Sequence, residues 1–284
     1  MPTHKEQTDT NLPPTMLGLI AGSGMLPVLA ARKAQSLGLP LAVFAVSSHA
    51  DHELKQLTQV YMQGGAGEVN RALRFLDENN CREVLFMGKV EKGRLFRDLK
   101  LDWGAIKILS RMTDRSDSAI MDALIKLLEE HGHRVLSQAD FLPELLAPQG
   151  QINQVKPTTS QRSDLALGFS LARQISQMGV GQTIVVKRGI VLAVEAIEGT
   201  DEAIRRGCKL GGAGVVVVKV AQPGHDPRYD LPTVGDSTIN ILTEGGAAVL
   251  GLEAGKVLMV GKEDMVVKAN DSKLALIGLT EAET

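Results

Sequence analysis

Residues 16–46, MLGLIAGSGMLPVLAARKAQSLGLPLAVFAV, give the clearest indication of the fold class. Its first six residues are mostly apolar and predict a buried strand, and Gly-Ser-Gly at 22–24 predicts a turn. Pro27 suits the first turn of a helix that is expected to run to about Leu37, and residues 41–46 predict a second strand. A strand, a helix and a second strand in this order predict a parallel sheet covered by helices, and therefore an α/β fold.

The same alternation continues through the first half of the chain. A helix is predicted over 68–79 and an apolar strand over 84–88, with Lys89 directly after it. A further amphipathic helix is expected over 117–131. We therefore expect a polar tail over residues 1–15 and a first domain over 16–150.

The second half of the sequence has a different pattern. QTIVVKRGIVLAVEAI, residues 182–197, predicts two strands joined at Arg188-Gly189, which is the signature of a hairpin and not of a helical crossover. Four more strands are expected over 215–220, 247–252, 256–260 and 274–279, separated by helices over 200–208, 236–244 and 262–270. The second domain, 151–284, is therefore predicted to be mixed α+β.

Composition excludes several classes of protein. The 284 residues carry a formal net charge of −2 and only 3% aromatic residues, so the chain offers neither a basic field nor stacking platforms for nucleic acid. Its 2 cysteines form no CxxC pair, which favours a reducing compartment. The sequence contains neither a signal-peptide pattern nor an apolar run long enough to span a membrane, so a cytoplasmic location is expected.

The Gly22-Ser23-Gly24 turn has two interpretations. Small residues between a strand and a helix let a phosphate approach the N–H groups of the helix N-terminus, but they also form ordinary tight turns. Pro27 stands where a dinucleotide fingerprint has its third glycine, and no acidic residue follows the second strand to hold a ribose. The turn alone leaves a nucleotide site and a structural turn equally open, and it disfavours a nicotinamide cofactor.

An acidic stretch, VEAIEGTD at 194–201, follows the second strand of the hairpin. Glu195, Glu198 and Asp201 lie close together there, and Thr200 is placed to begin a helix. Helix capping with solvated charges is the simpler interpretation, and a metal site is the functional one.

The loop KVAQPGHDPRYDLPTVG, residues 219–235, is the strongest functional signal. If it is extended, Asp226, Arg228 and Asp230 alternate by two and project to one side. Carboxylates hold Mg²⁺ and a guanidinium neutralises phosphoryl oxygens, so this trio predicts cleavage of a phosphoanhydride. An ordinary loop with a surface ion pair is the alternative.

Five segments, taken in order, resemble the LpxI-type UDP-2,3-diacylglucosamine pyrophosphatases of lipid A and lipopolysaccharide biosynthesis. They are GLIAGSGMLP, MGKVEKGRLF, GHRVLSQADFLPELLAPQG, GQTIVVKRGIVLAVEAIEGTDEAIRR and KVAQPGHDPRYDLPTVG. The resemblance spans residues 17–278. It implies a Rossmann-like N-terminal domain, a C-terminal domain of a less common fold, and a UDP-sugar lipid held between them with Mg²⁺.

The resemblance also implies an activity. Water is expected to attack the α-phosphorus of UDP-2,3-diacylglucosamine, which releases UMP and 2,3-diacylglucosamine 1-phosphate, known as lipid X. Contact with the cytoplasmic face of the inner membrane fits such a lipid substrate. The oligomeric state stays open, with a homodimer as one candidate.

The resemblance places an essential aspartate at Asp226, with Arg228 and Asp230 as its catalytic companions. His225 stands where the family has Gln, and Ser118 follows Asp117 where the family has paired aspartates, so Asp117 receives no role. The predicted metal ligands are Asp226, Glu195 and Asp201. The residues predicted to bind substrate are Gly22, Ser23, Gly24, Lys89, Lys187, Glu198, Thr200, Lys219 and Thr233. Phe141, Leu142 and the helix over 165–175 are candidates for an acyl-chain cleft or for plain core.

Two other functions remain open from the sequence. A nucleotide-binding oxidoreductase is favoured only by the Gly-Ser-Gly turn, and a non-catalytic nucleotide or lipid carrier would bind the same ligand without releasing UMP.

Overall fold

The computed structural model describes residues 15–47, 50, 52–90, 102–111, 116–224 and 226–281. The chain divides into two compact units, Met1–Ser137 and Gln138–Thr284. Both combine helices and strands, and the sequence predicts α/β alternation for the first and a mixed α+β arrangement for the second.

The first unit is built on a parallel sheet. Among the described residues its five strands lie in the order β3-β2-β1-β4-β5. Their bounds are β1 Met16–Ala21, β2 Leu41–Ala45, β3 Val60–Gln63, β4 Cys81–Met87 and β5 Arg134–Val135. The central strands β1 and β2 are almost wholly buried, because helices cover both faces of the sheet.

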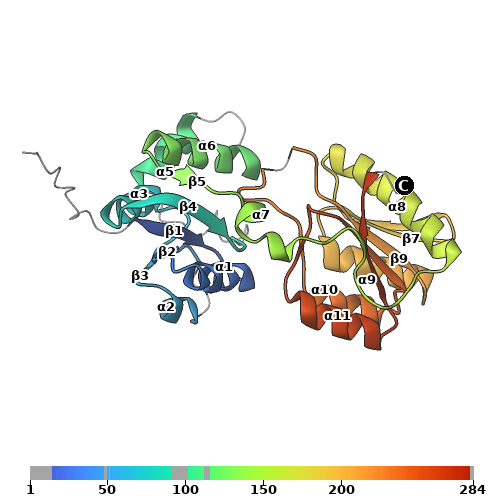
Figure 1. The fold of residues 1–284 in the computed structure, drawn as a ribbon. Coiled ribbons are helices and arrows are strands. Elements are labelled where there is room, and N and C mark those ends of the chain that lie inside the picture. The colour runs from blue at the N-terminus through green and yellow to red at the C-terminus, as the bar shows by residue number, and fades with distance from the viewer. Residues whose placement is uncertain are drawn as a thin grey trace, which may run out of the picture. The chain divides into compact units, whose positions relative to one another are not determined.

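The helices of this unit divide between the two faces (Figure 1). They are α1 Met25–Ser36, α2 Leu54–Leu57, α3 Val69–Glu78, α5 Trp103–Arg111 and α6 Asp117–Glu130. Figure 1 shows α1 and α2 on one side of the sheet and α3, α5 and α6 on the other. This is the doubly wound arrangement that the sequence predicts for its first half.

The second unit is built on a mixed sheet. Within the described residues its six strands lie in the order β6-β13-β11-β9-β7-β8. Their bounds are β6 Gly150–Gln151, β7 Thr183–Lys187, β8 Ile190–Val194, β9 Val216–Lys219, β11 Val249–Glu253 and β13 Ala275–Leu279. Strands β9, β11 and β13 are parallel, whereas β7, β8 and β6 each pair antiparallel to their neighbours. The predicted hairpin and the mixed character of this half are both confirmed.

Two hydrophobic clusters fill the two faces of the second sheet. One packs helix α8, Thr159–Gln177, against the sheet through Phe169, Val186 and Val218. The other includes Ile204 and Val217. It lies under three helices: α9 Thr200–Gly211, α10 Asp236–Glu244 and α11 Lys262–Asp271. Figure 1 shows α8 on the opposite side of the sheet from α9, α10 and α11.

Smaller elements complete the second unit. They are α7 Gln138–Phe141, the 3₁₀ turn Pro143–Leu145, and the parallel pair β10 Thr233–Val234 with β12 Leu258–Met259. Leu142 and Leu165 are almost fully buried, so these two candidates for an acyl-chain cleft are part of the core.

The division between the units lies earlier than the boundary near residue 150 that the sequence suggests. The Ala147 N–H donates to the Val257 carbonyl at 2.9 Å, and β6 pairs with β13. Ala147 itself is 1% exposed. The segment 138–151 therefore belongs by its contacts to the second unit.

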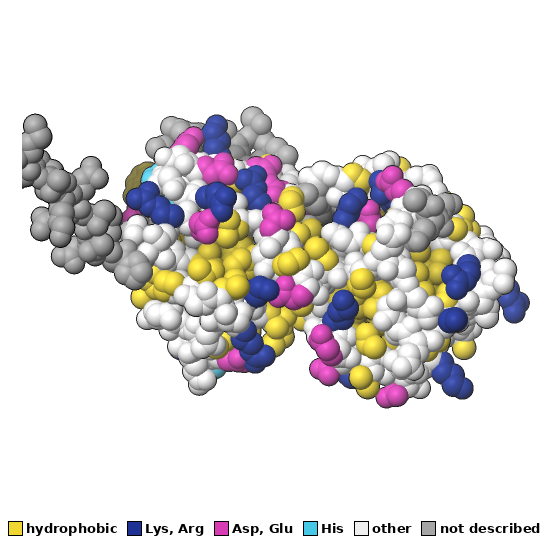
Figure 2. Space-filling view, viewed as in Figure 1, with side chains coloured by type: hydrophobic (Ala, Val, Ile, Leu, Met, Phe, Trp, Pro, Cys, Tyr) yellow, Lys and Arg dark blue, Asp and Glu magenta, His cyan; other side chains and the backbone are white. Residues whose placement is uncertain are grey.

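No helix in the described part of the chain is long and apolar enough to cross a membrane. On the face seen in Figure 2, cationic and anionic side chains are intermixed. This mixture agrees with the small net charge of the sequence.

Candidate active site at the carboxyl edge of the second sheet

Strand directions bring several predicted residues to one edge of the second sheet. The carboxyl ends of β9, β11 and β13 lie together because these strands are parallel. Strand β8 also ends there, since β7 runs antiparallel between β8 and β9. The acidic stretch after β8 and the long loop after β9 therefore start from the same edge, which is where ligands bind in open α/β sheets.

The Asp226–Asp230 segment is a turn. The N–H groups of Tyr229 and Asp230 both donate to the Asp226 carbonyl, at 3.2 and 3.0 Å. The prediction that Asp226, Arg228 and Asp230 alternate along an extended loop is therefore wrong. Pro227 explains the difference, because its fixed φ favours the second position of a turn.

Within this turn Asp226 and Arg228 form a close ion pair. The Arg228 Nε lies 2.9 Å from both carboxylate oxygens of Asp226, and Nη2 lies 2.6 Å from Oδ2. The Arg228 N–H also donates to Asp226 Oδ1 at 2.9 Å. These hydrogen bonds from Arg228 hold the pKa of Asp226 below its usual range, although partial burial opposes the shift. Asp226 is therefore ionised at neutral pH.

A row of polar residues crosses three strands at the same edge. Thr183 pairs directly with Lys219, and the Glu195 N–H donates to the Thr183 carbonyl at 2.8 Å. Directly opposed residues in an antiparallel pair place their side chains on the same face. Val185 and Val217, two residues along, pack with Ile204 of α9, so the row faces α9. We call Glu195, Thr183 and Lys219 the polar row.

Thr200, the first residue of α9, joins the two ends of the polar row. The Lys219 Nζ donates to Thr200 Oγ1 at 2.5 Å, and Thr200 Oγ1 donates to Glu195 Oε1 at 2.8 Å. Lys219 is 6% exposed, so its ammonium group is held inside the protein. Thr200 and Lys219, both predicted to bind substrate, are thus brought together with Glu195.

Some atoms of the polar row have no protein partner. Thr183 is fully buried, and its Oγ1 makes no hydrogen bond to the protein. The atoms Glu195 Oε2, in the polar row, and Gln182 Oε1, of the residue before Thr183, are also buried and make no hydrogen bond to the protein. Buried polar atoms are rarely left unpaired without a ligand or water to satisfy them.

The three predicted metal ligands do not form a single cage. Asp201 accepts hydrogen bonds from Ser237 at 2.9 Å and Thr238 at 3.3 Å, which ties α9 to the first turn of α10. No group of three or more His, Cys, Asp or Glu side chains that could hold a metal occurs in the described residues. Mg²⁺ is often held by one or two carboxylates and substrate phosphates, and the unpaired Glu195 Oε2 fits that mode.

A buried carboxylate that sequence reasoning missed fixes the start of the long loop. Glu253, at the end of β11, is 4% exposed and accepts from the Ala221 N–H at 2.9 Å. Its other oxygen accepts from Arg173 at 3.0 Å and Lys256 at 2.8 Å. The pairing of β11 with β9 creates this contact, so nothing local in the sequence could signal it.

Three other predicted residues serve local structure. Lys187 lies at the opposite end of β7, where its Nζ donates to the carbonyls of Gly211, the last residue of α9, and Ala213. Glu198 accepts from Arg206 at 2.7 Å and from the Ala196 N–H at 3.2 Å. Thr233 Oγ1 donates to the Leu231 carbonyl at 3.3 Å. The structure does not bring Lys187 to the carboxyl edge, and His225 lies outside the described residues.

In the first unit, the Gly22-Ser23-Gly24 turn is tied to Lys89. The Gly22 N–H donates to the Met87 carbonyl at 2.8 Å, and Ser23 and Lys89 exchange two backbone hydrogen bonds. A Cβ on Gly22 would lie 2.6 Å from the Lys89 carbonyl oxygen, so glycine is required for this close approach. Two of the N–H groups expected to cradle a phosphate are therefore already used, which favours the structural interpretation of the turn.

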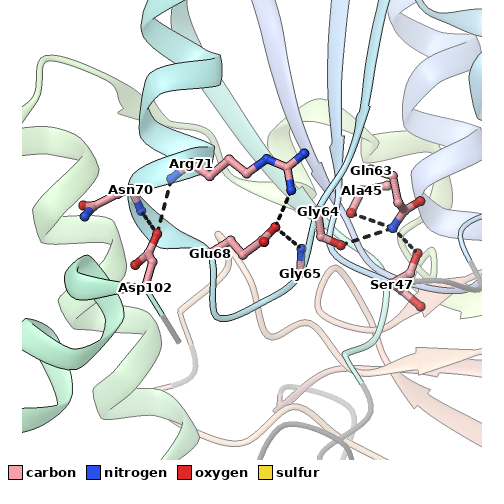
Figure 3. Close-up of polar contacts among 9 residues, drawn as sticks. All are labelled: Ala45, Ser47, Gln63, Gly64, Gly65, Glu68, Asn70, Arg71 and Asp102. Carbon is pink, nitrogen blue, oxygen red and sulfur yellow. Dashed lines mark hydrogen bonds and ion pairs between the residues drawn. The ribbon is translucent and has the colours of Figure 1, made fainter. Parts of the chain in front are cut away.

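In the same unit, side chains also hydrogen-bond to the backbone of the loops next to β3 and α3 (Figure 3). Gln63 Nε2 donates to the carbonyls of Ala45 and Ser47, at 3.0 and 3.1 Å. Asp102 accepts from the Asn70 N–H at 2.6 Å and so caps the start of α3. These polar groups are satisfied by the protein itself, in contrast to the open atoms of the polar row.

Comparison with known proteins agrees with the resemblance read from the sequence. The family described as "LpxI N-terminal domain" matches residues 16–145, and "LpxI C-terminal domain" matches residues 148–277. A curated relative, UDP-2,3-diacylglucosamine pyrophosphatase LpxI from Caulobacter vibrioides, is 32% identical over 279 residues. The match covers 94% of this chain and 98% of that protein.

Solved structures match only in part. An N5-carboxyaminoimidazole synthetase from Staphylococcus aureus has a TM-score of 0.28 and 17% identity, and the match covers 69% of this chain and 44% of that protein. The corresponding ribonucleotide synthetase from Thermotoga maritima has a TM-score of 0.25 and 13% identity, over 65% and 42% of the two chains. The two domain matches and the near full-length relative, in contrast, show that the chain belongs to the LpxI family.

Proposed function

We propose that the protein is a UDP-2,3-diacylglucosamine pyrophosphatase, which hydrolyses its substrate to UMP and 2,3-diacylglucosamine 1-phosphate. The observation that carries the proposal is the relative with this activity in its name, 32% identical over nearly the whole length of both chains. The chemistry of the second unit supports it, because the Lys219 ammonium is buried at the carboxyl edge of its sheet and the loop that starts from this edge carries the paired carboxylate and guanidinium of Asp226 and Arg228.

Each of these groups has a role in the proposed reaction. Arg228 and Lys219 neutralise the oxygens of the diphosphate, whose negative charge would otherwise repel a nucleophile. Asp226 is kept ionised by Arg228, so its carboxylate is available to orient the attacking water. The proposed attack is on the α-phosphorus, which makes UMP the product that gains the oxygen of water.

The proposal includes Mg²⁺, with Glu195 Oε2 as its first protein contact and Asp226 as a second. The ion, when bound, withdraws charge from the phosphoryl oxygens as a Lewis acid. The acyl chains of the substrate favour a lipid surface, so peripheral contact with the inner membrane is part of the same proposal.

The test is turnover by Asp226→Ala. The variant is expected to lose at least about 100-fold in kcat, since removal of a group acting on the transition state lowers kcat more than affinity. UMP release from UDP-2,3-diacylglucosamine with Mg²⁺ is measured by mass spectrometry. Asp271→Ala, at the exposed end of α11, is the matched control and should retain wild-type turnover.

Two additions test the finer parts of the proposal. Hydrolysis in ¹⁸O-water should label UMP, and label in the sugar phosphate would place the attack on the β-phosphorus. Turnover that survives exhaustive chelation would refute the role of Mg²⁺. A folded Asp226→Ala protein with wild-type kcat would refute the role of Asp226.

A further inference from the structure

The Thr200 hydroxyl lies between a buried cation and a carboxylate. It accepts from Lys219 Nζ and donates to Glu195 Oε1, so its one proton is already committed. Because the hydroxyl donates its proton to Glu195, it cannot also donate a hydrogen bond to a ligand. Thr200 is therefore better placed to act on Lys219 than on the substrate.

Lys219 is in an unusual electrostatic position. Among the residues that the structure describes, Lys219 is the one buried lysine. Its ammonium group contacts Thr200, the first residue of α9. The N-terminus of a helix is itself partly positive. Two positive groups directed to one place favour an anion there, and the chain of hydrogen bonds to Glu195 offsets their repulsion in the free protein.

The open atoms beside Lys219 give a second, independent observation. Thr183 is directly opposite Lys219 across the strand pair, on the same face, and its Oγ1 is fully buried and unpaired. A ligand oxygen that accepted a hydrogen bond from this hydroxyl would satisfy it. Lys219 and Thr183 therefore have the features of a binding site whose ligand is an oxyanion.

We propose that Thr200, held by Glu195, is a positioning residue that fixes the Lys219 ammonium, and that Lys219 and Thr183 together bind a diphosphate group. This inference rests on the proposed function for the identity of the diphosphate ligand. It moves Thr200 from direct substrate contact to an indirect role, and it adds Thr183, which no sequence pattern indicated.

The experiment measures UDP binding by calorimetry, so that binding is tested apart from turnover. Thr200→Val removes the hydroxyl at nearly constant volume and should weaken UDP binding about tenfold, the equivalent of 1.4 kcal/mol. Thr200→Ser retains the hydroxyl and should stay within about twofold of the wild type. Thr243→Val, on the outer part of α10, is the matched control and should bind UDP as the wild type does.

A double variant distinguishes positioning from a general structural effect. If Thr200 acts through Lys219, Thr200→Val should add almost nothing to the loss caused by Lys219→Met. Additive losses in the double variant, or wild-type UDP affinity in Thr200→Val, would overturn the inference. Thermal unfolding of each variant shows whether it is folded. If Thr200→Val is not folded, Thr200→Ala, which also removes the hydroxyl, takes its place.

Thr183→Val separates ligand contact from stability. Removing a buried, unpaired hydroxyl should leave the free energy of unfolding unchanged or raise it. UDP affinity should nevertheless fall by about tenfold. A fall in stability with unchanged UDP affinity would show that Thr183 serves the fold alone.

The outcomes for this inference and for the proposed function are distinct. A wild-type protein that binds UDP through Lys219 and Thr183 but releases no UMP from UDP-2,3-diacylglucosamine would refute the hydrolysis and support the inference. A wild type that does not bind UDP would overturn the inference, whether or not it hydrolyses the lipid.

Discussion

At the scale of the residue, the pairing of Asp226 with Arg228 sets the charge of the candidate site. Four hydrogen bonds between the two residues follow from their spacing of two in a turn. The side chains are 18% and 31% exposed, so the pair is only partly screened by solvent. Such a pair is stronger than a typical surface ion pair because it is bidentate and partly buried.

This pair predicts a specific pH dependence of stability. Because the pKa of Asp226 is lower in the folded protein than the ~3.9 of an unfolded chain, the pair stabilises the fold above pH ~4. The contribution is lost as the pH falls through the folded-state pKa. The free-energy difference between the wild type and Asp226→Asn should therefore shrink on acidification below pH ~4.

Urea unfolding at a series of pH values measures that difference. The same series with Asp271→Asn is the control, since Asp271 is exposed and should show little change. A difference between wild type and Asp226→Asn that stays constant down to pH ~2 would contradict the shift in pKa.

At the scale of the element, the β7–β8 hairpin depends on a buried carboxylate from α8. Asp164 is 4% exposed and accepts from the N–H groups of Arg188 at 2.9 Å and Gly189 at 2.7 Å. Both turn residues have positive φ, 51° and 75°, as a two-residue hairpin of type I′ requires. The side chain therefore satisfies the turn and ties the hairpin to the helix that covers it.

Asp164→Ala should destabilise the protein by roughly 2 kcal/mol, because two backbone N–H groups lose a charged acceptor. Asp164→Asn keeps one acceptor oxygen and should cost less. Urea unfolding measures both, with Asp271→Ala as the exposed control. Equal stability of Asp164→Ala and the wild type would mean that solvent replaces the carboxylate at no cost.

At the scale of the whole molecule, the position of the domain boundary is the main open prediction. The sequence suggests a division near residue 150, whereas contacts assign residues from Gln138 onward to the second unit. Gly255 N–H donates to the Ala147 carbonyl at 2.9 Å, and Ala147 N–H donates to Val257. A fragment that starts at residue 151 would lose these bonds and strand β6.

We expect the fragment 138–284 to unfold at a higher temperature than the fragment 151–284. The difference should be several degrees, since lost hydrogen bonds and a lost buried side chain each cost about 1 kcal/mol or more. Calorimetry of both fragments measures it, with the full chain as reference. Equal unfolding temperatures would favour the boundary near residue 150.

The fold class and most of the elements could be predicted from local signals in the sequence. Apolar runs and glycine turns are local signals, so strands such as β9 and helices such as α10 could be placed from them to within one or two residues. The hairpin at Arg188-Gly189 was predictable for the same reason. The family, too, followed from short segments in a fixed order.

Which side chains meet at the candidate site depends on how the strands pair. The order β9-β7-β8 places Thr183 between Lys219 and Glu195, although these residues are far apart in the chain. The turn at Pro227 pairs Asp226 with Arg228 and prevents the alternation that an extended loop would give. Which distant strands become neighbours depends on the packing of the whole unit and has no local signal. Pro227, in contrast, is a local turn signal that the prediction of alternating side chains did not use.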